Sequence, residues 1–91
     1  MKIDSVTEVT LFAASMLASA EAEEAARNFP PFNSAHEGYA VLLEEVDELW
    51  AHVKTNQKRR DIEAMRKEAI QVAAMALRFV ADVCNEKRGR K

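Results

Sequence analysis

Residues that interrupt regular secondary structure are scarce in this chain of 91 residues and lie at few positions. Pro30 and Pro31 are the only prolines, and Gly38 and Gly89 are the only glycines. Proline removes a backbone hydrogen-bond donor and disfavours helix at the residue before it. Elsewhere the chain is rich in Ala, Leu, Glu, Lys and Met, which are strong helix formers. The sequence therefore predicts an all-α protein whose first break lies at the two prolines.

Ahead of the prolines, the chain is expected to form one helix over about residues 6–27. Ser5 followed three residues later by Glu8 is a capping-box pattern, which marks the start of a helix. The apolar residues that follow are spaced so that they share one helix face. Residues 21–24 are mostly charged, so this end of the helix faces either solvent or a partner.

Two aromatic residues, Phe29 and Phe32, flank the prolines in the linker after this helix. Large apolar side chains are unusual in a connection that runs over the surface. Two interpretations are open: the rings pin the linker to the core, or one of them lines a pocket for a flat ligand.

Two further helices are predicted after the linker, over about residues 35–54 and 60–85. Ser34 and Glu37 form a second capping box at the start of the earlier one. The polar connection between the two helices is short, which favours an antiparallel pair. The earlier helix carries an apolar arc wide enough to pack on two neighbours. The members of this arc are Tyr39, Leu42, Leu43, Val46, Leu49, Trp50 and Val53.

Charge and cysteine content exclude several functional classes. A net charge of −2 provides no bulk attraction to nucleic acid or to an anionic membrane. No segment reaches the length and hydrophobicity of a membrane span or a secretory signal. Cys84 is the only cysteine, which leaves no disulfide framework, and its thiol is expected to be buried. We therefore expect a cytoplasmic protein that binds neither nucleic acid nor membrane.

Each of the two later helices carries acidic residues along one of its edges. Residues three and four apart share a helix face, so Glu45 and Glu48 lie side by side, whereas Asp47 points away. Glu68 and Gln71 share an edge of the last helix, and an antiparallel turn brings the two edges together. Two carboxylates about 6 Å apart, at an effective dielectric of about 20, repel by roughly 3 kcal/mol. A hard divalent cation with oxygen ligands removes this cost; the alternative is that these are ordinary solvated helix edges.

The spacing of these residues resembles the signature of a known family. The all-α nucleoside triphosphate pyrophosphohydrolases of the MazG type carry EExxE followed by ExxD. The corresponding residues here are Glu44, Glu45, Glu48, Glu68 and Gln71. The surrounding sequence, over about residues 34–82, looks like small phage and mobile-element members of that family. At Gln71 the chain departs from the signature, which has Asp: an amide oxygen can still coordinate a metal, but one negative charge is lost.

The resemblance implies a fold, an activity and an assembly. Residues 1–91 are expected to form one helical domain, with an N-terminal helix, an antiparallel pair and a flexible tail over about residues 86–91. Family members form homodimers and often homotetramers. This chain is therefore expected to be a homo-oligomer in which association completes a four-helix-bundle core. The implied reaction is Mg²⁺-dependent, with Mn²⁺ as an alternative, and cleaves a nucleoside triphosphate to a monophosphate and pyrophosphate in nucleotide-pool housekeeping.

Carried over position by position, the resemblance also implies roles for single residues. The implied metal ligands are Glu45, Glu48, Glu68 and Gln71. The implied catalytic residues are Glu44, as an acid that binds metal or orients water, and Glu48. Three basic residues are candidate substrate contacts from their positions near these edges: His52, Lys54 and Arg78. The alternative function is a helical oligomer that lost turnover at Gln71 and binds nucleotide or a protein partner.

Overall fold

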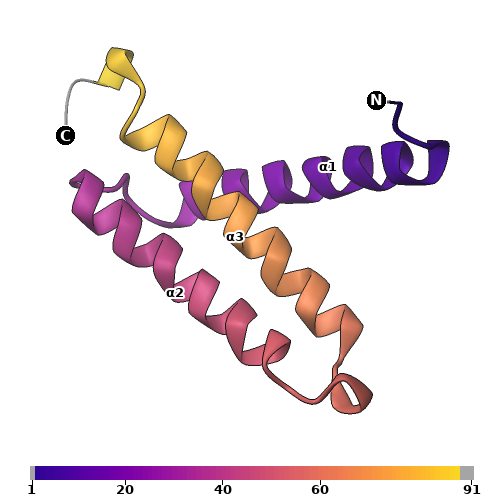
Figure 1. The fold of residues 1–91 in the computed structure, drawn as a ribbon. Helices are drawn as coiled ribbons and strands as arrows, with labels where there is room; N and C mark the ends of the chain where they lie inside the picture. The colour runs from indigo at the N-terminus through magenta and orange to yellow at the C-terminus, as the bar shows by residue number, and fades with distance from the viewer. Residues whose placement is uncertain (1, 89–91) are drawn as a thin grey trace.

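A computed structural model describes residues 2–88 and shows a chain built from helices joined by short connections (Figure 1). The three long helices are α1 (Ser5–Asn28), α2 (Ala35–Val53) and α3 (Ile62–Asp82). Two 3-10 turns follow α2 and α3, η1 (Gln57–Arg59) and η2 (Glu86–Arg88). No strand is present between residues 2 and 88, so the predicted all-α class is confirmed. Of the predicted flexible tail, residues 86–88 form η2, and residues 89–91 lie outside the described residues.

The start of α1 differs from the sequence prediction. Asp4, rather than Ser5, is the N-cap, and its Oδ1 accepts a hydrogen bond from the backbone N–H of Thr7 at 2.8 Å. Its Oδ2 accepts a second bond from the Thr7 hydroxyl at 3.1 Å. A carboxylate at this position also interacts favourably with the positive end of the helix dipole. The predicted capping box of Ser5 and Glu8 is therefore wrong, because the preceding carboxylate takes the capping position.

At the start of α2 the predicted cap is confirmed. Ser34 Oγ accepts a hydrogen bond from the backbone N–H of Glu37 at 3.0 Å. The Glu37 carboxylate accepts from the backbone N–H and the side-chain amide of Asn33, at 2.9 and 3.1 Å. This carboxylate therefore reaches one residue further back than the capping-box pattern predicts.

The connection between α2 and α3 shortens α3 relative to the prediction. Arg60 donates hydrogen bonds to two carbonyl oxygens, that of Val53, the last residue of α2, at 2.6 Å and that of Thr55, two residues beyond it, at 3.2 Å. Asp61 then becomes the N-cap of α3, and its Oδ1 accepts from the backbone N–H of Ala64 at 3.1 Å. Arg60 therefore belongs to the connection and not to the helix.

The end of α3 also comes earlier than predicted, at Asp82 instead of residue 85. Cys84 consequently lies beyond the helix, and its thiol is exposed. The predicted burial of this thiol is therefore wrong.

The short connection places α2 and α3 side by side and antiparallel, as predicted, and α1 crosses α3 (Figure 1). The N-terminal half of α1 extends away from the α2–α3 pair, and its side chains are exposed up to residue 13. The C-terminal half of α1 packs on α3 through the buried Ala18 and the half-buried Ala22 and Ala25. No helix between residues 2 and 88 combines the length and apolar character needed to cross a membrane.

A small core joins the helices at the linker. The buried apolar residues between positions 2 and 88 are Ala18, Phe32, Ala74 and Met75. Phe32 is 3% exposed, so its ring pins the linker to the core, as the first interpretation predicted for both linker aromatics, whereas Phe29 is 62% exposed. Gly38 allows α2 to approach this ring, because an added Cβ would lie 3.0 Å from Cδ2 of Phe32 and 2.8 Å from Cδ2 of Phe79.

Two polar side chains of α3 contact the linker and hold it against the helix. Asp82 Oδ2 accepts a hydrogen bond from the backbone N–H of Phe32 at 3.2 Å and lies 3.6 Å from Nη2 of Arg78. The same Nη2 donates to the carbonyl oxygen of Pro30 at 3.1 Å. The guanidinium carbon lies 4.3 Å from the centre of the Phe32 ring, within the range of a cation–π interaction. We call these four residues the linker clamp.

Most of the large apolar side chains that remain exposed in the single chain lie on two faces. One face is the N-terminal half of α1, with Val6, Val9, Leu11, Phe12, Met16 and Leu17. The other lies on α2, with Tyr39, Leu43, Val46 and Trp50. The second group belongs to the arc predicted to pack on two neighbours, and in one chain part of that arc remains uncovered.

Candidate metal centre

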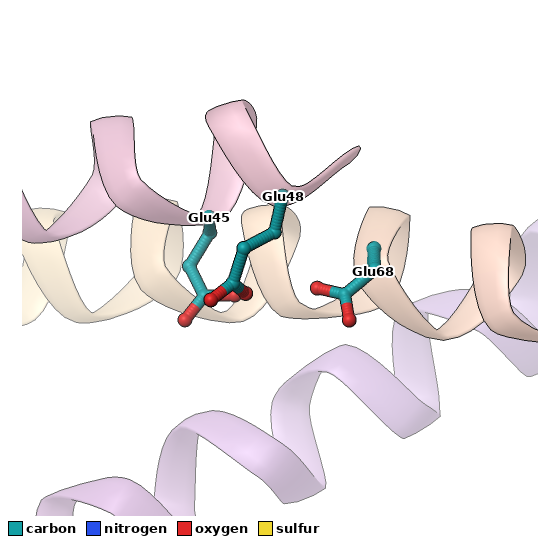
Figure 2. Close-up of side chains that lie close together, drawn as sticks. All are labelled: Glu45, Glu48 and Glu68. Carbon is teal, nitrogen blue, oxygen red and sulfur yellow. The ribbon is translucent and has the colours of Figure 1, made fainter. Parts of the chain in front are cut away.

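Three carboxylates from two helices meet at one point of the structure. Glu45 and Glu48 lie one turn apart on α2, and Glu68 points toward them from α3 (Figure 2). One oxygen of each carboxylate lies within 4.8 Å of an oxygen of each of the others. The antiparallel pairing of α2 and α3 causes this meeting, because it returns the chain to the same level after the turn. We call these three residues the carboxylate triad.

Burial and repulsion from neighbouring carboxylates raise the pKa of Glu45, one member of the triad. Burial is the largest cause that raises the pKa of Glu45 to about 7. The charge of Glu48, a hydrogen bond with Glu48, and the charges of Glu68 and Glu44 also contribute to this shift. A carboxyl group that keeps its proton close to neutral pH marks a place where added positive charge is favourable. Three oxygen donors in this setting suit a hard divalent cation such as Mg²⁺ or Mn²⁺.

The raised pKa of Glu45 predicts that the metal-free protein loses stability as pH rises from about 5 to about 7. In this window the folded state keeps a proton on Glu45, whereas the unfolded state, with a pKa near 4.5, has lost it. The unfolded state binds fewer protons, so the free energy of unfolding falls with rising pH. Melting temperatures in EDTA between about pH 5 and pH 8 measure the effect.

Two variants separate this effect from the rest of the titration. Glu45→Gln removes the titrating group, so its melting temperature should lose this part of the pH dependence. Asp47→Asn changes an exposed residue of the same helix and should follow the wild type. Identical profiles for the wild type and Glu45→Gln would contradict the prediction.

Gln71 lies one turn beyond Glu68 on α3, and its side chain contacts α1. Its Nε2 donates a hydrogen bond to Oε2 of Glu21 at 3.0 Å. An ionised carboxylate only accepts, so this contact fixes the amide nitrogen toward α1 and leaves the amide oxygen available. Coordination of a metal through that oxygen stays a prediction. Glu21 was not singled out from the sequence, where the only signal was the charged end of the first helix.

A pocket of about 510 Å³ opens beside the triad, bounded by all three long helices and the linker. Glu45 belongs both to the triad and to the pocket wall, and Glu21 and Gln71 stand on the same wall. Phe29, at 62% exposed, and the buried Phe32 also line it. The volume lies within the range of small-ligand sites. Both linker aromatics therefore line a pocket, and binding of a flat ligand there, as in the second interpretation, stays a prediction.

The other predicted site residues lie in different surroundings. Glu44 is exposed, and its charge contributes to the raised pKa of Glu45. His52 is half-buried near the end of α2, Lys54 is the exposed C-cap of that helix, and neither is among the residues that line the pocket. Arg78 lines the pocket, but at 6% exposed its guanidinium is engaged in the linker clamp. Substrate binding by these three basic residues stays a prediction.

Comparisons of the chain with models of protein families, with curated proteins and with solved structures found no match. The function is therefore inferred from the triad, the adjoining pocket and the uncovered apolar faces.

Proposed function

We propose that the chain is a divalent-cation-dependent nucleoside triphosphate pyrophosphohydrolase of the MazG type, active in nucleotide-pool housekeeping. It cleaves between the α and β phosphates and produces a nucleoside monophosphate and pyrophosphate. The carboxylate triad carries this proposal, because acids that are distant in sequence and match the family spacing lie together. The adjoining pocket provides room for the rest of a nucleotide, and Glu45 connects the two.

We assign different roles in this reaction to different residues of the chain. Water attacks the α phosphorus, and the bond from that phosphorus to the oxygen that bridges the α and β phosphates breaks, so pyrophosphate leaves. The triad would hold the cation, with Gln71 as a further oxygen donor. A bound Mg²⁺ or Mn²⁺ neutralises phosphate charge and lowers the pKa of the attacking water. Glu44 and Glu48 are the exposed acids of the EExxE run, and we assign them to orient this water and accept its proton.

We also propose that the protein works as a homodimer or homotetramer in which a second copy completes a four-helix bundle. The support is the exposure of large apolar side chains, among them Phe12 at 68% and Trp50 at 57%. Exposed groups of large apolar side chains mark interaction sites, and small chains gain stability by covering them. Sedimentation should give a mass of at least two chains, and the mass of a single chain would contradict this assembly.

Pyrophosphate release from a panel of nucleoside triphosphates tests the proposed activity. We expect release that requires Mg²⁺ or Mn²⁺ and stops when EDTA is added. Glu48→Gln should abolish it, because the variant loses both a ligand and an acid, whereas the adjacent and exposed Asp47→Asn should keep it. Release without a divalent cation, or release that survives Glu48→Gln, would refute the proposed mechanism.

A second candidate function is a helical oligomer that binds nucleotide or a protein partner without turnover. The observation that favours it is the hydrogen bond from Gln71 to Glu21, because the position that carries Asp in the family signature is neutral and engaged with α1. Nucleotide binding by calorimetry, with no pyrophosphate released from any substrate, would favour this second candidate.

A further inference from the structure

The pocket beside the triad has an unusual balance of polar groups. Its wall contains four carboxylates, whereas Arg78 is the one basic residue among those that line it. That guanidinium donates to the linker and lies beside Asp82. Hydrogen-bond acceptors therefore dominate the wall, and a ligand that presents N–H donors fits it better than one that presents carbonyl oxygens.

Three of the four carboxylates are already engaged, either by two hydrogen bonds or in the triad. Glu24 accepts hydrogen bonds from two neighbours on its own helix, and Glu37 accepts two from the linker. Glu45 belongs to the triad. The fourth, Glu21, accepts one bond from Gln71, at its Oε2. Among the described residues, no hydrogen bond engages its other oxygen, so this carboxylate is the acceptor that a ligand can use.

Two features make Glu21 a site for recognition rather than a freely rotating surface acid. Its hydrogen bond to Gln71 joins α1 to α3 and holds the carboxylate on the pocket wall. Phe29, on the same wall, exposes an aromatic face at the end of α1, and planar bases stack on such faces. The wall thus combines an aromatic surface with a positioned acceptor, next to the carboxylates that would face the phosphates.

We propose that this pocket holds the nucleobase and that Glu21, positioned by Gln71, selects bases with an exocyclic amino group. Cytosine and adenine present an N–H₂ donor where uracil and hypoxanthine present a carbonyl oxygen. The amino group donates to the Glu21 carboxylate, whereas a carbonyl oxygen at the same place is repelled by it. This inference rests on the proposed function for the location of the phosphates, and it adds the substrate class.

Matched base pairs test the selection directly. dCTP with dUTP, and dATP with dITP, are pairs in which an amino group is replaced by a carbonyl oxygen. We expect kcat/KM for Mg²⁺-dependent pyrophosphate release to favour the amino-bearing member by about ten- to hundredfold, the range of a hydrogen bond to a charged group. Calorimetric binding of the α,β-methylene analogues of the same four nucleotides measures the preference without the chemical step.

Variants on α1 and at the linker separate selection from other effects. Glu21→Gln should bring both ratios close to one, because an amide can either donate or accept. Glu23→Gln, an exposed residue of the same helix that does not line this pocket, should keep the wild-type ratios. Phe29→Ala should weaken the binding of all four nucleotides by a similar factor. Melting temperatures of the variants check that each remains folded.

The outcomes distinguish this inference from the proposed function. Metal-dependent release with ratios near one in the wild type would overturn the inference and leave the pyrophosphohydrolase in place. Preferential binding of amino-bearing analogues without any release would support the inference and overturn the enzyme. Analogue binding without preference, ratios unchanged in Glu21→Gln, or no binding of any analogue would each overturn the inference.

Discussion

Glu68→Gln is expected to lower metal-dependent pyrophosphate release by about a hundredfold, because it removes one of the three carboxylates that we propose hold the cation. The change keeps the size of the side chain and removes only its charge. Gln71, one turn further along α3, is already neutral and bonded to Glu21, so it supplies no replacement carboxylate. The measurement is the initial rate of pyrophosphate release at saturating Mg²⁺, together with calorimetric titration of Mn²⁺ alone.

The matched control is Glu63→Gln, which neutralises an exposed acid of the same helix outside the triad. Its rate and its Mn²⁺ affinity should remain close to those of the wild type. Full activity in Glu68→Gln would show that the triad takes no part in the mechanism. Unchanged nucleotide or partner binding in Glu68→Gln, with no turnover in the wild type, would instead favour the oligomer that binds without catalysis.

Asp82→Ala is expected to lower the free energy of unfolding by about 3 kcal/mol, because it leaves the Arg78 guanidinium buried without its carboxylate. It also removes the acceptor for the backbone N–H of Phe32. This loss is large for a domain of this size, whose total stability is typically about 5–15 kcal/mol. Urea unfolding followed by circular dichroism gives the value.

Two further variants test the physical reason for this loss. Asp47→Ala, at an exposed position of α2, should change the stability by no more than about 0.5 kcal/mol. Adding Arg78→Met to Asp82→Ala should recover part of the loss, because no buried charge then remains unpaired. Equal losses for Asp82→Ala and Asp47→Ala would show that the linker clamp contributes little to stability.

The linker clamp also bears on the candidate site. Three of its four residues, Pro30, Phe32 and Arg78, line the pocket beside the triad. A weakened clamp therefore disturbs the pocket wall even though Asp82 is not among the residues that line it. We infer that stability and pocket shape are coupled through the linker in this protein.

Local sequence patterns predicted the helices well because helices depend on residues close in the chain. Apolar spacing located all three, and Ser34 was identified correctly as the cap of α2. The errors came at helix ends, where several residues compete for the same backbone groups. Asp4 replaced Ser5 as the cap of α1, and Arg60 joined the connection instead of α3.

The triad shows how much of the candidate site the spacing of residues in the sequence can predict. Helical periodicity placed Glu45 and Glu48 on one edge and Asp47 away from it, since three residues make almost one turn. The short turn between α2 and α3 then allowed Glu68 to be matched with that edge, and the structure has these three carboxylates together. Whether they bind a cation stays a prediction.

The sequence by itself determined the three helices, their approximate limits and the edge on which the acids lie. Only the tertiary structure decided that Glu21 meets Gln71, that Asp82 holds Phe32, and that Cys84 is exposed. Both hydrogen bonds join residues fifty positions apart, and they depend on the angle at which α1 crosses α3 and on the path of the linker. Periodicity records which side of a helix is apolar, but it carries no information about the crossing of two helices, because packing of distant side chains sets that angle.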